Sequence, residues 1–348
     1  MNRRNFLRLA LAGGASLVLA ACDMSGQETA VSEDIADIAV TAPEAAPRRA
    51  DRAEATLVLD WVPNTNHTGL YAARALGYFE EENLDFKIEE PVEVDATSVV
   101  AAGNAEFGIG FQEFLTPALV QGAPVVSVAA IIQENTSGFA SLKSRGISRP
   151  RDFEGAVYGG FGSPLELAIL QVMMEQDGGD FSKLESVGAG AADFLTIIQR
   201  DVDLYWIFYA WQGVKADLEG IELDVAFLSD WGVPNYYTPL IMANSGMLGR
   251  RREIGERAMA AISRGYDFAI ANPAEAAEML IQASPEIDVP LAHASQLWLS
   301  PRYQGDADRW GRQQGSVWGG MTQWMLDREL IEEMFEWENA FSNELLPE

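Results

Sequence analysis

Four segments of the chain carry residue types that can hold a small polar ring, and each follows an expected β-strand. The first, residues 60–67, places Trp61 close to Asn64 and to His67, one of two histidines in the chain. A Trp face stacks on planar rings, and Asn and His supply hydrogen-bond donors and acceptors. The same composition fits an ordinary helix-capping loop with its Trp turned into the core, so this segment alone favours neither interpretation.

The second segment, residues 111–113, ends in Glu113 and follows an expected strand at 107–110. An amide next to a carboxylate suits recognition of an amino-substituted ring or of a hydroxyl group. Such residues are also common at helix N-termini, which is the plainer explanation of so short a segment. Glu113 is therefore a candidate only in combination with the other segments.

The third segment, residues 159–166, reads GGFGSPLE. Gly160 and Gly162 permit a ligand to approach the backbone closely, and Glu166 could either reach that ligand or compensate a helix dipole. The segment lacks the Gly-Lys-Ser/Thr of a P-loop and the full spacing of a dinucleotide fingerprint. It therefore favours contact with a neutral or weakly polar ligand over a phosphate site.

The fourth segment, residues 204–213, has five aromatic side chains among its first eight residues. A buried strand normally uses branched aliphatic residues, so Tyr and Trp on both faces exceed what packing requires. Stacking on a planar ring explains Tyr205, Tyr209 and Trp211, with core packing as the alternative. Farther along the chain, Tyr236 could add a lid or a contact near a hinge.

The N-terminus predicts export and lipid anchoring. Residues 1–21 combine a basic start, an apolar stretch too short for a confident bilayer span and a run of small residues, which is typical of a signal peptide. A paired arginine favours the twin-arginine route, and Cys22 ends a lipobox-like sequence and would carry the lipid. Residues 22–54 have the composition of a flexible tether. A buried N-terminal helix is the alternative.

Charge and cysteine usage limit the possible functions. The chain has 24 basic and 52 acidic side chains and a formal net charge of −28, which disfavours nucleic acid and anionic lipid headgroups as partners. Its one cysteine, Cys22, rules out an internal disulfide and a thiolate metal site in the remainder of the chain. We expect no metal and no cofactor.

From residue 55 onward, short apolar runs alternate with amphipathic segments, which is typical of an α/β fold. We predict two α/β lobes joined by two crossings: lobe 1 from residues 55–142 and 245–348, and lobe 2 from residues 143–244. Ligands of open α/β sheets bind beyond the carboxyl ends of the strands, where the four segments are expected to lie.

Several motifs together resemble one family. They include LDWVPNTNHTGLY at 59–71, GGFGSPLE, the YAWQG at 209–213, LWLSPRYQ at 297–304 and WENAFSNELLP near the C-terminus. The chain resembles the NMT1/THI5-like superfamily, and within it the solute-binding proteins of ABC importers for thiamine pyrimidine precursors and riboflavin. Their fold is that of type II periplasmic binding proteins.

Together, the N-terminus and the resemblance predict a monomer that is anchored to the cell membrane by its lipid and faces the periplasm or cell exterior. It would deliver a planar ring to permease and ATPase subunits. The resemblance implies that the ring lies in the interlobe cleft. The residues implied as ligand contacts are Trp61, Asn64, His67, Glu113, Glu166, Tyr205, Tyr209 and Trp211. Where Trp-Glu-Gly is expected, this chain has Gln212, which weakens the pyrimidine assignment and favours riboflavin as the alternative.

Two other function classes fit the sequence less well. Eukaryotic relatives synthesise the pyrimidine with a cysteine-rich iron motif and a reactive lysine, whereas this chain has a single cysteine and no lysine between Asp60 and Leu70. An enzyme, with His67 as general base, is therefore not expected. A sulfonate or nitrate binder would need an Arg-lined cleft, yet none of the four segments contains Arg or Lys.

Overall fold

The computed structural model describes residues 52–91, 94–160, 162–189, 193–200 and 202–348. The predicted signal peptide, the predicted lipidation residue Cys22 and the predicted tether up to residue 51 lie outside these ranges. The first strand begins at Ala53, so the predicted tether, which runs to residue 54, overlaps the start of the folded body. Within the described residues, no helix has the length and apolar character needed to cross a bilayer.

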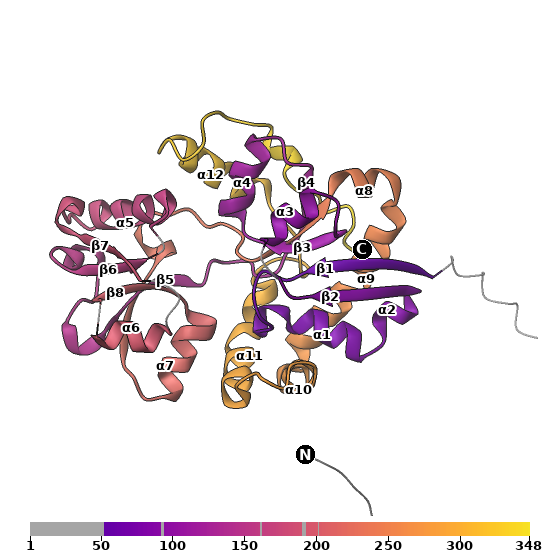
Figure 1. The fold of residues 1–348 in the computed structure, drawn as a ribbon, viewed down its shortest axis with the longest axis horizontal. Coiled ribbons are helices and arrows are strands. Elements are labelled where there is room, and N and C mark those ends of the chain that lie inside the picture. Colours follow the sequence, from indigo (N-terminus) through magenta and orange to yellow (C-terminus); the bar gives the residue numbers. More distant parts are fainter. Residues whose placement is uncertain (1–51, 92–93, 161, 190–192, 201) are drawn as a thin grey trace, which may run out of the picture. The chain divides into compact units, whose positions relative to one another are not determined.

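In the described residues, ten strands form two five-stranded sheets, and Figure 1 shows the sheets with the helices around them. Sheet 1 has the order β2-β1-β3-β10-β4 and sheet 2 the order β7-β6-β8-β5-β9. The strands of sheet 1 are β1 Ala53–Val58, β2 Leu84–Glu89, β3 Phe107–Gly110, β4 Val125–Ala130 and β10 Leu240–Asn244. Those of sheet 2 are β5 Ser137–Leu142, β6 Val157–Gly160, β7 Glu185–Gly188, β8 Leu204–Phe208 and β9 Leu223–Phe227.

Helices cover both sheets, as expected for an α/β fold. Those that belong to sheet 1 are α1 Thr68–Ala75, α2 Tyr78–Glu81, α3 Ala96–Ala101, α4 Gln112–Val120, α8 Ser245–Arg250, α9 Arg252–Ala271, α10 Pro273–Ala283 and α11 Val289–Gln304. Those that belong to sheet 2 are α5 Pro164–Gln176, α6 Phe194–Arg200 and α7 Val214–Leu218, and α12 Gly315–Leu326 lies near the C-terminus. The predicted architecture of two α/β lobes with two crossings is confirmed.

The crossings lie at different residues from those predicted. β5 pairs with β8 and β9, so residues 137–142 belong to sheet 2, not to lobe 1. β10 pairs with β3 and β4, so residues 240–244 belong to sheet 1, not to lobe 2. The crossings are therefore residues 131–136 and 228–239. Both strands are largely apolar and buried, so composition gave no indication of which sheet each would join.

The C-terminal region also departs from the prediction, which assigned all of residues 245–348 to lobe 1. In α12, Met321, Trp324 and Met325 are buried in the same core cluster as Tyr158 of β6 and Phe139 of β5. α12 also contacts α4, which follows a strand of sheet 1. This helix therefore packs against elements of both lobes.

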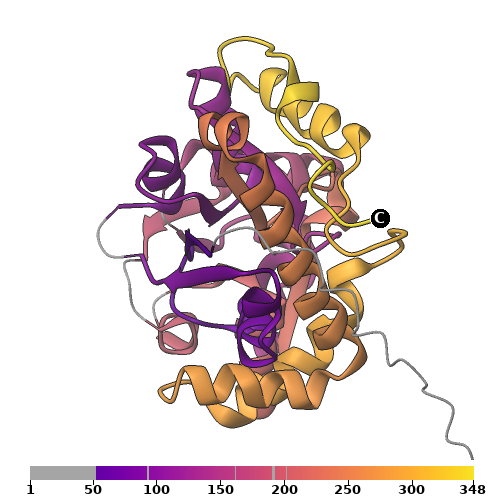
Figure 2. The same ribbon diagram turned by 90° about the vertical axis from the view of Figure 1, so that its right-hand side faces the viewer.

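Close backbone packing holds α1 against α9, which run side by side (Figures 1 and 2). The ring of Tyr266 occupies the position that a side chain at Gly69 would need. A Cβ at Gly265 would lie 2.0 Å from the carbonyl oxygen of Gly69. Tyr266 itself stacks on Trp310, with ring centroids 4.0 Å apart. This packing fixes α1, and with it the segment that precedes it.

We predict that Gly265→Ala lowers the free energy of unfolding by about 1–3 kcal/mol, because the added methyl group forces two helix backbones apart. The matched control is Gly320→Ala in α12, where a Cβ meets nothing within 4 Å. That change should raise the free energy of unfolding by about 0.5–1 kcal/mol, since alanine is the better helix former. Denaturant unfolding of both variants measures this, and equal effects would contradict the packing described.

Candidate functional site

The two crossings bring one edge of each sheet together. β1 and β3 are parallel, and β10 is antiparallel to β3 and β4, so β1, β3 and β4 end at the edge where β10 begins. In sheet 2, β6 and β8 end at the edge where β5 begins. The chain leaves sheet 1 after β4 to enter β5, and returns from β9 to enter β10. The four predicted segments follow strand ends at these joined edges.

In the first segment, the predicted contacts Asn64 and His67 are buried and already hydrogen-bonded. His67 Nε2 lies 2.7 Å from Asp60 Oδ1, and its Nδ1 accepts from the backbone N–H of Asn64 at 3.3 Å. The Asn64 side chain accepts from Asn66 N–H and donates to Val62 O. These bonds form a capping box for a short 3-10 helix, Thr65–His67. Asn64 and His67 therefore shape the loop, while Trp61 is 51% exposed.

This first loop is tied to the fourth segment through α11. Thr65 Oγ1 lies 2.6 Å from Ser295 Oγ, which donates to the carbonyl oxygen of Ala210. Ala210 belongs to a π-helix, Tyr209–Gly213, that directly follows β8. The predicted contact Tyr209 packs on Trp298 of α11, with ring centroids 5.3 Å apart. Sequence reasoning missed Ser295 and Trp298, because only the folded chain brings α11 to this edge.

The aromatic run itself divides between the two faces of sheet 2. Tyr205 is buried against Phe194 of α6, so it lies in the core of one face and not at the strand end. Trp206, the next residue, instead contacts Phe139 on the opposite face. The half-buried Trp211 lies in the π-helix at the edge. Gln212 Oε1 accepts from the backbone N–H of Phe208 at 3.1 Å, so this amide closes its own turn.

In the third segment, Glu166 is buried, and described residues of the same loop and strand donate to its carboxylate. Its Oε2 accepts from Tyr158 OH at 3.1 Å and from Gly162 N–H at 3.2 Å, and Ser163 Oγ donates to Oε1 at 3.1 Å. A Cβ at Gly160 would lie 2.4 Å from the Tyr158 ring and 2.5 Å from Glu166 Oε2. Gly162 has a φ of 76°, which favours glycine. Gly160, Gly162 and Glu166 therefore build this loop.

Between the two edges lies a group of buried polar side chains, which we call the joint cluster: Gln112, Glu113, Asn135 and Tyr236. Gln112 and Glu113 begin α4, and Asn135 and Tyr236 lie on the two crossings. Gln112 Oε1 accepts from Tyr237 N–H at 2.9 Å, and Thr238 Oγ1 lies 3.4 Å from Glu113 Oε1. Asn135 Oδ1 accepts from Ser137 N–H at 2.7 Å. The cluster thus joins three separate stretches of chain.

Each member of the joint cluster has one buried polar atom without a hydrogen-bond partner among the described residues. These atoms are Gln112 Nε2, Glu113 Oε2, Asn135 Nδ2 and the Tyr236 hydroxyl. The hydroxyl lies beside Asn135 and Ser137 without the geometry of a hydrogen bond. A buried unpaired polar group costs about 1–3 kcal/mol, so four together are expensive unless another molecule completes them. The cluster is therefore the strongest candidate for ligand contact.

Burial also changes the ionisation of Glu113. Removal from water raises the pKa of its carboxyl group from the ordinary value of 4.5 to about 8, although its backbone and Thr238 hydrogen bonds oppose the rise. Near neutral pH the side chain is therefore mostly a neutral acid that both donates and accepts hydrogen bonds. Burial likewise raises the pKa of Tyr236, which stays a hydroxyl.

The predicted residues do not line either of two cavities found elsewhere. One, of about 470 Å³, lies between residues 232–234 and α12. The other, of about 300 Å³, lies beside α9 at Ser263 and Asp267. Across the described part of the chain, no group of three or more His, Cys, Asp or Glu side chains is arranged to hold a metal ion.

A family model described as NMT1/THI5 like matches residues 64–276, which is more than half of the chain. The chain belongs to the NMT1/THI5-like family. It is 27% identical to the formylaminopyrimidine-binding protein of Halalkalibacterium halodurans, over 82% of this chain and 89% of that protein. It is 26% identical to the 4-amino-5-hydroxymethyl-2-methylpyrimidine phosphate synthase of Legionella pneumophila, over 85% of this chain and 93% of that enzyme.

The fold of this family member matches that of the periplasmic aliphatic sulphonate binding protein SsuA from Escherichia coli. The TM-score is 0.66 at 14% identity, over 83% of this chain and 97% of that structure. The predicted periplasmic-binding-protein fold is thereby confirmed. At this identity the likeness concerns the fold and carries no information on the ligand.

We predict that Glu113 makes stability fall as pH rises. The folded protein holds the carboxyl proton up to pH about 8, whereas the unfolded chain releases it near the ordinary value of 4.5. Between these values the unfolded state binds fewer protons, so this group lowers the free energy of unfolding by up to about 1.4 kcal/mol per pH unit. Chemical denaturation of wild type and Glu113→Gln at pH 5, 6.5 and 8 measures the difference. If the difference in free energy of unfolding between wild type and Glu113→Gln did not change with pH, the raised pKa would be contradicted.

Proposed function

We propose that the chain is the solute-binding component of an ABC importer and that its ligand is a formylaminopyrimidine-type thiamine precursor. The joint cluster is the observation that carries this proposal. It offers amide donors, a hydroxyl group and a carboxylic acid at the edges where periplasmic-binding-protein folds take their ligands. A small ring with nitrogen acceptors and an exocyclic amino group matches these groups. The name of the Halalkalibacterium relative describes such a ligand.

Aromatic side chains at the joined edges of the two sheets support a flat ligand. Tyr209 and Trp211 lie at the edge of sheet 2, and the half-exposed Trp61 lies at the edge of sheet 1. Rings of this kind stack on heterocycles with about 0.5–1.5 kcal/mol per pair beyond simple burial. The Gln212 side chain bonds its own backbone, so its presence in place of Glu favours neither pyrimidine nor riboflavin.

The joint cluster and the cysteine content disfavour the two other function classes, a sulfonate binder and a pyrimidine synthase. A sulfonate needs cationic donors, whereas the joint cluster contains a buried acid and no Lys or Arg. The eukaryotic synthases of this family use a cysteine-rich iron motif, as the resemblance implies, whereas this chain has the single cysteine Cys22. We further propose that Cys22 anchors the protein to the outer face of the cell membrane, where closure of the lobes around the ligand would present it to permease and ATPase subunits.

Calorimetric titration with formylaminopyrimidine, riboflavin, thiamine and an alkanesulfonate tests the proposal. We predict one formylaminopyrimidine bound per chain, with the compound recovered unchanged after prolonged incubation. Conversion of the bound pyrimidine would indicate an enzyme. Saturable binding of the sulfonate or of riboflavin, with no pyrimidine bound, would contradict the assigned ligand.

We predict that Tyr236→Phe weakens pyrimidine binding between about twofold and tenfold, which corresponds to the loss of one hydrogen bond of about 0.5–1.5 kcal/mol. The matched control is Tyr237→Phe. The Tyr237 hydroxyl accepts from Gln314 N–H at 2.8 Å and lies outside the joint cluster. Its removal should lower stability and leave affinity unchanged, as measured by calorimetry and thermal unfolding. Unchanged affinity in Tyr236→Phe, with weakened affinity in Tyr237→Phe, would indicate that the ligand binds elsewhere.

A further inference from the structure

The four predicted segments contain three acidic side chains, Asp60, Glu113 and Glu166, which differ in how fully their oxygens are used. Asp60 is paired with His67, and Glu166 accepts from donors of its own loop and strand. Glu113, which is 4% exposed, has Thr238 at 3.4 Å from one oxygen and no partner for the other. Glu113 is thus the acid among these three with a buried oxygen that has no hydrogen-bond partner among the described residues.

The surroundings of Glu113 supply no compensating charge. Its neighbours Tyr236 and Thr238 are neutral, as are Asn135 and Ser137 beside Tyr236. The crossings also carry Glu134 and Asp230, which are exposed, and neither is among the causes of the raised pKa of Glu113. α12 packs against α4, and its sequence GSVWGGMTQWML contains no charged residue. Within α4, residues 112–120 contain no other ionisable group. The charge state of Glu113 therefore depends on its burial and on what binds beside it.

We propose that Glu113 is the specificity-determining residue of the site and forms hydrogen bonds with the aminopyrimidine edge of the ligand. It does so in its protonated, neutral form. Its Oε2–H donates to a ring nitrogen, and its Oε1 accepts from the neighbouring exocyclic amino group. The unpartnered Gln112 Nε2 and Asn135 Nδ2 are donors suited to a carbonyl oxygen elsewhere on the ligand. This inference rests on the proposed function and names the group that recognises the ligand.

This pairing makes binding depend on pH in a defined direction. The complex contains one proton between the carboxyl group and the ring nitrogen, and the free protein holds that proton below its pKa of about 8. Affinity should therefore be constant from pH 6.5 to 7.5. Above pH 8 it should fall by up to about tenfold per pH unit, because the proton must first be taken up.

Two substitutions at this position separate the role of the proton from the role of the side-chain volume. Glu113→Gln keeps one donor and one acceptor in the same shape, so we expect affinity within about fivefold of wild type at pH 7 and no decline up to pH 9.5. Glu113→Met keeps the volume and removes both groups, so we expect a loss of about tenfold to a hundredfold because the ligand's polar edge is left unpaired.

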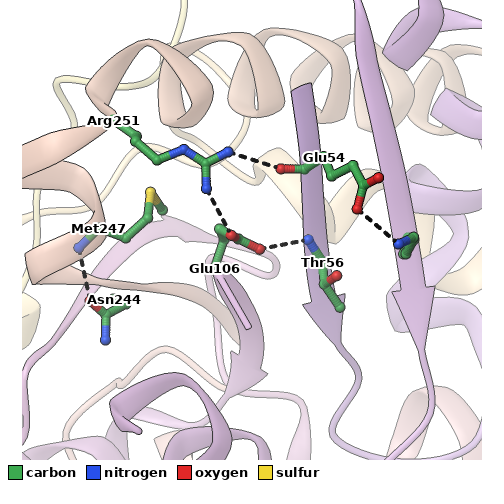
Figure 3. Close-up of polar contacts among 7 residues, drawn as sticks. Glu54, Thr56, Glu106, Asn244, Met247 and Arg251 are labelled. Carbon is green, nitrogen blue, oxygen red and sulfur yellow. Dashed lines mark hydrogen bonds and ion pairs between the residues drawn. The ribbon is translucent and has the colours of Figure 1, made fainter. Parts of the chain in front are cut away.

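The matched control is Glu106→Gln. Glu106 Oε2 accepts from Thr56 N–H at 2.9 Å, and its Oε1 lies 3.2 Å from Arg251 Nη1 (Figure 3). It directly precedes β3, at the end of that strand away from the joint. This variant should keep the wild-type affinity and the decline above pH 8, whatever its effect on stability.

The experiment is calorimetric titration of wild type and the three variants with formylaminopyrimidine and with its analogue lacking the ring amino group, from pH 6.5 to 9.5. We expect wild type to prefer the amino compound by about tenfold or more, and Glu113→Met to lose this preference. An affinity of wild type that does not change with pH, or a preference retained by Glu113→Met, would overturn the inference while leaving the proposed function intact. If wild type bound neither compound, the proposed function itself would fail.

Discussion

Both crossings between the sheets pass the same pair of sheet edges, and the remainder of the site depends on this constraint. β4 ends and β10 begins at one edge, and β5 begins at the other. The chain between them must run through the joint, where backbone and side-chain polar groups are removed from water. Buried backbone groups find partners there, for example Gln112 N–H with Tyr237 O at 2.9 Å. In the side chains of the joint cluster, four buried polar atoms have no hydrogen-bond partner among the described residues.

This arrangement exchanges stability for recognition. Elsewhere at the edges, polar groups are matched within the chain: Asp60 with His67, and Glu166 with Tyr158 and Ser163. These pairs hold the loops in place and require no ligand. Glu113 and Tyr236 differ because each has a buried oxygen without a hydrogen-bond partner among the described residues, so the free-energy cost of its burial is not offset. Sites prepared in this way bind polar ligands selectively, because a ligand that leaves these groups unpaired gains none of the hydrogen-bond energy that a matching ligand gains.

Much of the architecture could be predicted from local pattern. Alternating apolar runs and helical spacing indicated two α/β lobes, and the rule that ligands bind at strand ends led to Glu113 and Glu166 before their neighbours were known. The motifs indicated the family that the comparisons then confirmed. These features depend on local sequence, so they can be predicted without knowledge of the tertiary contacts.

Other features depended on pairing that no local pattern reveals. Asn135 was missed because residues 133–136 were not recognised as a crossing, which became evident only once β5 paired with β8. Tyr205 and Trp206 are equally aromatic, and only the orientation of β8 sends Tyr205 toward Phe194. Asn64 and His67 carry the chemistry expected of a site, yet their bonds to Asp60, Val62 and Asn66 make them builders of the loop.

The central claim is that the joint cluster is where the ligand binds. A crystal structure of the chain crystallised with formylaminopyrimidine tests it most directly. The account predicts the pyrimidine ring between the two edges, with Glu113 Oε2 about 2.7–3.2 Å from a ring nitrogen and with Asn135 or Tyr236 in hydrogen-bond contact. A pyrimidine bound elsewhere, for instance in the cavity between residues 232–234 and α12, would contradict it.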